Sequence, residues 1–129
     1  MAVVAIALQS LLALVFLMAG GTKLLGIQMQ VENFKRYGYP QWFRLVTGAV
    51  EVTGAVGMVV GVWVGQVAIA AGFWLGITMI GAVYTDLFRR GSAPPSGAAA
   101  PAVLLALAVA VAVLRIIEVV DWEMPLDAR

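Results

Sequence analysis

Four long apolar stretches, separated by shorter polar segments, account for most of the chain. They cover residues 3–25, 43–61, 67–88 and 100–120. A transmembrane helix needs about 20 mostly apolar residues, because each residue adds about 1.5 Å to its length. The pattern therefore predicts four membrane-spanning helices. The first stretch lacks a basic leading segment and a clear cleavage site, so we expect a retained helix rather than a signal peptide.

The connection between the first two stretches has a helical pattern of its own. Val31, Phe34 and Tyr37 recur at helical spacing, with charged residues between them. This pattern is typical of a short amphipathic helix in the headgroup region of a membrane. Gly38 and Pro40 are expected to end that helix, since proline disfavours the helical conformation of the residue before it.

The other two connections are shorter and predict simple turns. Residues 62–66 indicate a tight turn, so the second and third spans are expected to form an antiparallel hairpin. Residues 89–97 read RRGSAPPSG, which is typical of a polar loop. The predicted fold is an all-α, integral membrane four-helix bundle with a short interfacial helix in its first loop. It forms a single transmembrane domain over residues 1–129.

The composition agrees with this membrane assignment. Hydrophobic residues make up 63% of the chain and charged residues 12%, whereas soluble domains carry about 25% charged residues. A soluble domain of this size buries only about two thirds of the surface of its unfolded chain. The excess apolar surface must therefore face lipid.

Lysine and arginine are distributed unevenly between the two sides of the predicted bundle. The side with the first and third loops carries Lys23, Lys35, Arg36, Arg44, Arg89 and Arg90. The opposite side carries Arg115 and Arg129. Positive residues favour the cytoplasmic side of a membrane. We expect a multi-pass protein of the cell membrane with loops one and three in the cytoplasm and both termini outside.

The residue types that are absent exclude several functions. The chain has no cysteine and no histidine, so it lacks the commonest metal and haem ligand and the commonest general base. No metal is expected, and redox chemistry would need a bound cofactor or a partner protein. A net charge of +1 argues against a nucleic-acid partner. Without a nucleophile–base pair or a phosphate loop, the chain is not expected to be an enzyme on its own.

Glu51 is the most informative residue, because it falls near the middle of the second span. A charged side chain at that depth costs roughly 2.5 kcal/mol or more, so it is expected to face the bundle interior. Lys23, Asp86 and Arg44 lie near the inner ends of their spans and are expected to converge with Glu51 in the inner half of the bundle. The residues considered for a ligand site are Glu51, Lys23, Asp86, Arg44, Thr47, Tyr84 and Trp74.

More than one interpretation of these residues stays open. Glu51 and Lys23 can form an ion pair that only joins two helices, or Glu51 can be protonated. They can also form a polar pocket for a quinone head group or another polar-headed lipophile. Trp74 fits ordinary packing as well as a pocket wall. Arg115 and Glu118 are expected to form a surface pair or to reach toward the interface, rather than to form a site.

Small residues recur at four-residue spacing in three of the spans. Such stripes let helix backbones approach closely in membranes. They fit packing inside the bundle, and they also fit the seam of a homodimer. The stripes are Ala49, Thr53, Gly57 and Gly61; Ala68, Gly72 and Gly76; and Ala102, Ala106 and Ala110.

Four motifs follow one another along the chain: FLMAGGTKL, FKRYGYP, GAVEVTGAVG and IGAVYTDLFRRG. In this order, over about residues 11–115, they resemble the DoxX-like family of small membrane proteins. The resemblance implies a four-helix membrane bundle. In some members it also implies a link to redox metabolism, as in small subunits of thiosulfate:quinone oxidoreductases and partners of superoxide-detoxifying and sulfur-transfer proteins. Asp86 stands where many members have histidine. The motif positions are Gly20, Lys23, Gly38, Pro40, Glu51 and Gly54.

Three functions are carried forward as hypotheses. The first is a non-enzymatic membrane subunit that docks soluble redox proteins or presents a quinone-like lipophile as its cofactor. The second is a small proton-coupled multidrug-type exporter that uses Glu51, although such transporters carry their carboxylate in the first helix. The third is a lipid-binding membrane protein with the same pocket, for which membrane lipids are the partners.

Overall fold

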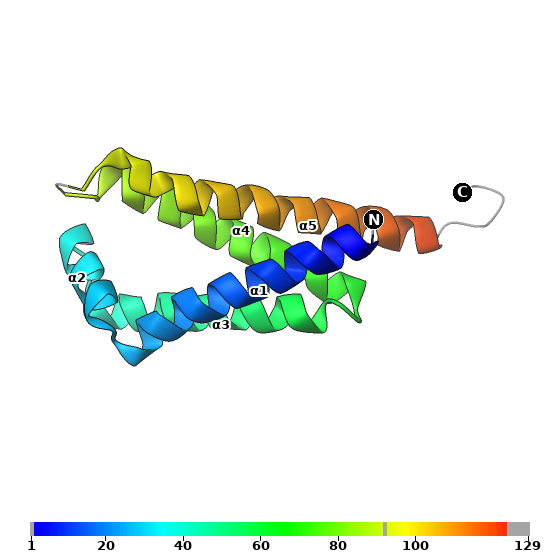
Figure 1. Cartoon of the computed structure of the whole chain (residues 1–129), viewed down its shortest axis with the longest axis horizontal. Coiled ribbons are helices and arrows are strands. Elements are labelled where there is room, and N and C mark those ends of the chain that lie inside the picture. Colours follow the sequence, from blue (N-terminus) through cyan, green and yellow to red (C-terminus); the bar gives the residue numbers. More distant parts are fainter. Residues whose placement is uncertain (1, 92, 124–129) are drawn as a thin grey trace.

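The computed structural model describes residues 2–91 and 93–123, and nearly all of them are helical (Figure 1). A short helix, α2 (Gln28–Tyr37), lies between the first two long helices, and a 3₁₀ turn, η1 (Pro95–Ala98), precedes the last. The predicted all-α fold, with four spans and a short helix in the first loop, is confirmed. The four helices long and apolar enough to cross a membrane are α1 (Ala2–Leu25), α3 (Gln41–Val60), α4 (Gly65–Phe88) and α5 (Ala99–Glu123).

Glycine and proline set the ends of α2. Gly26 follows α1 with φ +69°, and Gly38 follows α2 with φ +78°. A side chain rarely adopts this left-handed conformation, so glycine suits both turns. The N–H of Gly38 donates to the carbonyl of Lys35, and Pro40 precedes α3 in an extended conformation. The prediction that Gly38 and Pro40 end this helix is confirmed.

The four spans pack as two close pairs, α1 with α3 and α4 with α5. In Figure 1, α4 and α5 run side by side, while α1 crosses α3. Small residues allow these approaches. Gly20 of α1 lies against the backbone of Gly48 in α3, and Gly72 of α4 lies against the backbone of Ala108 in α5. Close backbone packing of this kind stabilises helix pairs in lipid.

The two pairs join through α3 and α4 in the half of the bundle away from α2. Three glycines of α3 face larger neighbours there, and a Cβ on any of them would press on α4: Gly54 on Leu75, Gly57 on Ala71 and Gly61 on Ala68. The turn between α3 and α4 makes them antiparallel neighbours, as the sequence predicts.

The small-residue stripe of α4 is buried within the bundle, whereas in the α3 stripe only Gly57 and Gly61 pack against α4, and Ala49 and Thr53 are exposed. The stripe in α5 does not pack there, because Ala102 and Ala106 are exposed and Ala108 and Ala112 face Gly72 instead. The prediction that the α5 stripe packs inside the bundle is therefore wrong. A homodimer through these outward alanines stays a prediction.

A buried polar network closes the bundle at the end opposite α2. The side-chain amide of Gln9 in α1 donates to the carbonyl of Met58 in α3 at 3.0 Å. Arg115 in α5 donates through Nε to Gln9 at 2.7 Å and through Nη1 to Glu118 at 2.7 Å. Three helices are tied together by this network.

The network corrects one expectation from the sequence. Arg115 pairs with Glu118 as expected, but Arg115 is not at the surface, because only 7% of the residue is exposed. Its second partner, Gln9, is 106 residues away in the chain. The burial of Arg115 also removes it from the exposed cations of that side, and Arg129 lies outside the described residues.

Candidate functional site

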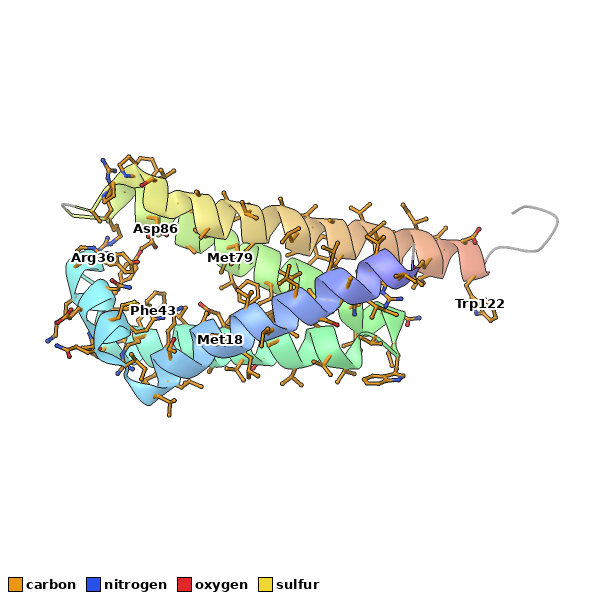
Figure 2. All side chains as sticks on the ribbon, in the orientation of Figure 1. Met18, Arg36, Phe43, Met79, Asp86 and Trp122 are labelled. Atoms are coloured by element: carbon orange, nitrogen blue, oxygen red, sulfur yellow. The ribbon has the colours of Figure 1, made fainter. Side chains whose placement is uncertain are left out.

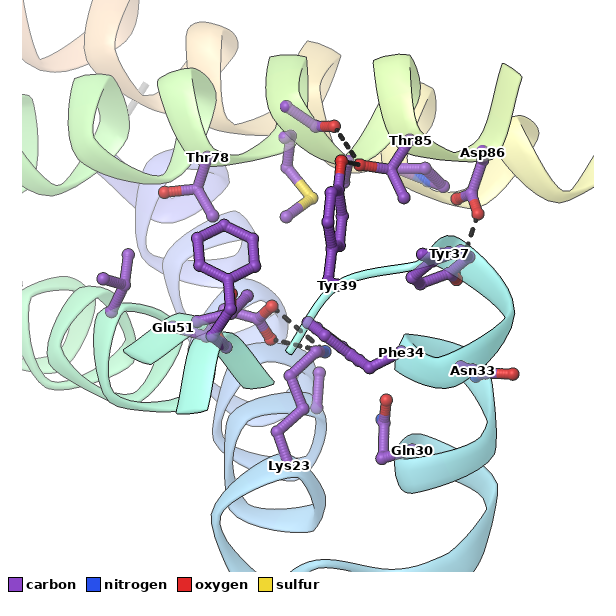
Figure 3. Close-up of a pocket in the computed structure, with 18 of the residues that line it drawn as sticks. Lys23, Gln30, Asn33, Phe34, Tyr37, Tyr39, Glu51, Thr78, Thr85 and Asp86 are labelled. Atoms are coloured by element: carbon purple, nitrogen blue, oxygen red, sulfur yellow. Dashed lines mark hydrogen bonds and ion pairs between the residues drawn. The ribbon is translucent and has the colours of Figure 1, made fainter. Parts of the chain in front are cut away.

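The bundle contains a partly open cavity of about 550 Å³ at the end where α2 lies. Figure 3 shows α2 along one side of it, with side chains from α1, α3 and α4 pointing inward. Figure 2 places Asp86, Arg36 and Phe43 toward this end and Trp122 at the other. Apolar and aromatic side chains make up most of the wall. A cavity of this size and character is typical of small-molecule sites, which measure roughly 300–1,000 Å³.

An ion pair between Lys23 of α1 and Glu51 of α3 lies in this cavity. Lys23 Nζ is 3.1 Å from Oε1 of Glu51 and 3.2 Å from Oε2 (Figure 3). The side chains are 14% and 4% exposed. Helical side chains lean toward the N-terminus of their own helix. Since α1 and α3 are antiparallel, these two lean toward each other, and lysine reaches the deeper carboxylate.

Two tyrosines connect α2 and the loop after it to the end of α4. The hydroxyl of Tyr37 donates to Asp86 at 3.2 Å. The hydroxyls of Tyr39 and Thr85 are 3.0 Å apart. Because Thr85 donates to the carbonyl of Gly81, Tyr39 acts as the donor to Thr85. Burial and the negative charge of Asp86 raise the pKa of Tyr37, so its phenol stays protonated and able to donate.

Arg89 supports this arrangement from outside the cavity. Its Nε donates to the carbonyl of Tyr37 at 2.8 Å, and its guanidinium lies 4.5 Å from the centre of the Tyr39 ring. A cation over an aromatic face is attracted by the electron density of the ring. Arg89 therefore holds both tyrosines in place.

Four aromatic rings form one wall of the cavity. Phe34 is buried in the middle, with ring centres 5.6 Å from Tyr37, 6.2 Å from Tyr39 and 6.3 Å from Phe43. From the sequence, Phe34 and Tyr37 are expected on the apolar face of an interfacial helix, and this aromatic cluster is not among the expected site residues. The sequence does contain a sign of this cluster, because the aromatic residues Tyr39 and Phe43 lie on either side of Pro40 at the turn into α3.

The structure brings together five of the seven residues proposed from the sequence. Lys23, Glu51, Thr47, Tyr84 and Asp86 all line the cavity. Asp86 lies near the α2 end and pairs with Tyr37 rather than with a lysine.

The other two proposed residues lie elsewhere. Arg44 caps the end of α1, where its Nη1 donates to the carbonyl of Lys23, so it does not converge with Glu51. Trp74 does not line the cavity. Its Nε1 donates to the carbonyl of Val50 in α3 at 2.9 Å, and the residue is 47% exposed. The expectation that Arg44 converges with Glu51 is wrong.

The motif glycines and proline act as scaffold rather than as site. Gly20 and Gly54 permit close helix approach, and Gly38 and Pro40 set the turn between α2 and α3. Within residues 2–91 and 93–123, no cluster of three or more acidic side chains is placed to hold a metal ion. The cavity can therefore recognise a ligand through one ion pair, several hydroxyls and aromatic faces.

The sequence model of the DoxX-like family matches residues 7–111. The chain belongs to the DoxX-like family. The matched range includes every cavity residue from Phe16 to Leu104. A relative of this DoxX-like protein, the uncharacterized protein YdgD of Bacillus subtilis (strain 168), is 42% identical over 76 residues, which are 58% of this chain and 67% of the relative. No solved structure matches the chain.

Proposed function

We propose that this DoxX-like protein is a non-enzymatic membrane component that binds a polar-headed lipophile, with a quinone as the best-fitting head group. The observation that carries the proposal is the Lys23–Glu51 ion pair inside a cavity with mostly apolar and aromatic walls. A few polar groups in an apolar pocket are the usual means of orienting a small ligand.

A purely structural role for the ion pair explains less. Gly20 and Gly48 already hold α1 and α3 together by direct backbone contact next to the pair. The Lys23–Glu51 pair also joins α1 and α3, but both residues line the cavity, where a ligand can reach them. In a membrane protein, buried charges are costly and usually functional.

The wall of the cavity supports a planar head group. Aromatic rings bind one another in offset or edge-to-face arrangements, and the cluster around Phe34 offers such faces. Lys23 has three N–H donors, and its Nζ contacts Glu51 alone among the described contacts, so it can donate to a quinone carbonyl as well. Because the chain has no cysteine or histidine, electrons would pass through the ligand or a partner.

The link to redox metabolism comes from the family resemblance. If it holds, a soluble redox protein would meet the α2 end, where Lys35, Arg36 and Arg89 are exposed. We also propose that this end faces the cytoplasm, because the exposed cations gather there.

Ligand binding is favoured over proton-coupled export. In the exporter hypothesis Glu51 exchanges protons with substrate, but here it is paired with Lys23 at 3.1 Å. Each cycle would have to break that pair. A general lipid-binding role uses the same cavity and differs only in which molecule occupies it.

The test is extraction of bound lipophiles from protein purified in a mild detergent, followed by mass spectrometry. We expect the wild-type protein to retain a quinone, and the Lys23→Met/Glu51→Met double variant to lose it. Glu32→Gln is the matched control, because Glu32 is exposed on α2 and bonds only to Gln28 among the described hydrogen bonds. A single phospholipid species in place of the quinone would favour the lipid-binding role. Wild-type protein without any specific lipophile would contradict the proposal.

A further inference from the structure

Most of the exposed residues that line the cavity lie in α3 and α4. These helices touch in the half of the bundle away from α2, where Gly57 faces Ala71 and Gly61 faces Ala68. Toward α2, residues of both helices line the cavity instead. The two helices diverge toward α2 (Figure 1), and both contribute to the wall of the cavity there.

Two hydrogen bonds between the α3 side and α4 mark the limits of this region. At the deeper limit, Trp74 Nε1 donates to the carbonyl of Val50 at 2.9 Å. At the other limit, the hydroxyls of Tyr39 and Thr85 are 3.0 Å apart. Thr85 follows Trp74 by about three helical turns, or roughly 16 Å at about 1.5 Å per residue. We call the region between these two bonds the window.

The residues that frame the window line the cavity and are also exposed on the outside of the bundle. Val46 of α3 is 47% exposed and Ile77 of α4 is 69% exposed. Gly81 follows Ile77 by one turn of α4, it is also exposed and lines the cavity, and a Cβ on it would meet no atom within 4 Å. Since these helices have the length and composition of membrane spans, this outer face meets hydrocarbon.

The polar groups of the frame are already satisfied within their own helices. Thr78 donates to the carbonyl of Trp74 at 2.8 Å, and Thr47 donates to the carbonyl of Phe43 at 2.8 Å. With their hydroxyls bonded to the preceding turn, these two threonines need no polar partner in the window. The window is therefore suited to an apolar chain.

We propose that the ligand is a long-chain amphiphile that enters from the bilayer, with its head group at the Lys23–Glu51 pair and its hydrocarbon tail in the window. This inference rests on the proposed function and narrows the ligand class. The ligand is a membrane-dissolved molecule with a tail, not a soluble metabolite. Binding energy then comes from the tail as well as from the head group.

The test measures binding of two benzoquinones that share one head group, one with a decyl tail and one without a tail. The full chain is reconstituted in phosphatidylcholine nanodiscs. Gly81→Leu and Gly81→Trp place a side chain in the window. Gly21→Leu and Gly21→Trp are the matched controls, because a Cβ on Gly21 also meets nothing within 4 Å and Gly21 does not line the cavity.

We expect Gly81→Trp to weaken binding of the decyl quinone by about tenfold or more, or about 1.4 kcal/mol. Gly81→Leu should weaken it less, binding of the tailless quinone should not change, and both Gly21 variants should bind like wild type. The proposal that the tail lies in the window is wrong if the Gly81 variants bind both quinones like wild type. It is also wrong if the variants weaken the binding of both quinones equally. In either case Glu51→Gln still tests the head-group site, because this variant should weaken the binding of both quinones. Wild-type protein that binds neither probe would overturn the proposed function and this inference with it.

Discussion

Gly20 of α1 and Gly48 of α3 meet backbone to backbone. A Cβ on Gly20 would lie 2.7 Å from the carbonyl oxygen of Gly48, and a Cβ on Gly48 would lie 2.9 Å from that of Gly20. Lys23 follows Gly20 by three residues, and Glu51 follows Gly48 by three residues. The glycine contact thus fixes the distance across which the ion pair forms.

The first prediction concerns this contact. Gly20→Val should destabilise the protein by about 1–3 kcal/mol, because overpacking forces the helices apart. Unfolding in mixed detergent micelles measures the loss. Gly21→Val is the control, since its Cβ meets open space. Equal stability of the two variants would mean that the glycine contact does not determine how α1 and α3 pack.

The second prediction separates the two roles of the Lys23–Glu51 pair. Lys23→Met should cost about 3–5 kcal/mol, because it leaves Glu51 buried without its partner. The double variant Lys23→Met/Glu51→Met should recover most of that stability, since well-packed apolar groups replace a buried pair at little cost. It should not recover ligand binding. If the double variant retains the lipophile like wild type, the ion pair only joins the two helices and does not bind the ligand.

The third prediction concerns the opposite end of the bundle. Arg115→Met removes the donor to Gln9 and leaves Glu118 without its partner. The expected loss is about 1–3 kcal/mol, the usual cost of an unsatisfied buried polar group. Ligand binding should not change, because Arg115 does not line the cavity. Thermal unfolding and lipophile retention are measured together, with the exposed Lys35→Met as control. Loss of ligand at unchanged stability would contradict this assignment.

The fourth prediction concerns orientation. The chain has no cysteine, so single-cysteine variants can be labelled without background. In intact cells, a membrane-impermeant maleimide should label Gln66→Cys, in the first turn of α4. It should label Gly97→Cys, in the loop before α5, only after the membrane is opened. The opposite pattern would place the α2 end outside the cell.

The sequence predicts the spans of this protein well, because their length and apolarity are local properties of the chain. Each of the four predicted spans ends within a few residues of its helix, and Gly38 and Pro40 mark the turn between α2 and α3. The depth of Glu51 in the bundle follows from helix geometry. The lean of the Lys23 side chain toward Glu51 follows from it as well.

The sequence does not predict how the spans pair. Gln9 and Arg115 are 106 residues apart, and nothing in the local pattern connects them. Arg44 and Trp74 do not line the cavity, for a related reason. Each lies in a part of its span close to cavity residues in the sequence. Each side chain nevertheless donates to a backbone carbonyl of a neighbouring helix instead of facing the cavity. Rotation about the helix axis depends on neighbours that only the fold provides.

The most direct measurement is a structure of the protein determined in lipid without added ligand. The account predicts elongated density whose wide end contacts Lys23 and Glu51 and whose narrow end runs between Val50 and Gly81 toward the bilayer. A cavity filled by side chains, with α3 and α4 in contact along their whole length, would contradict it.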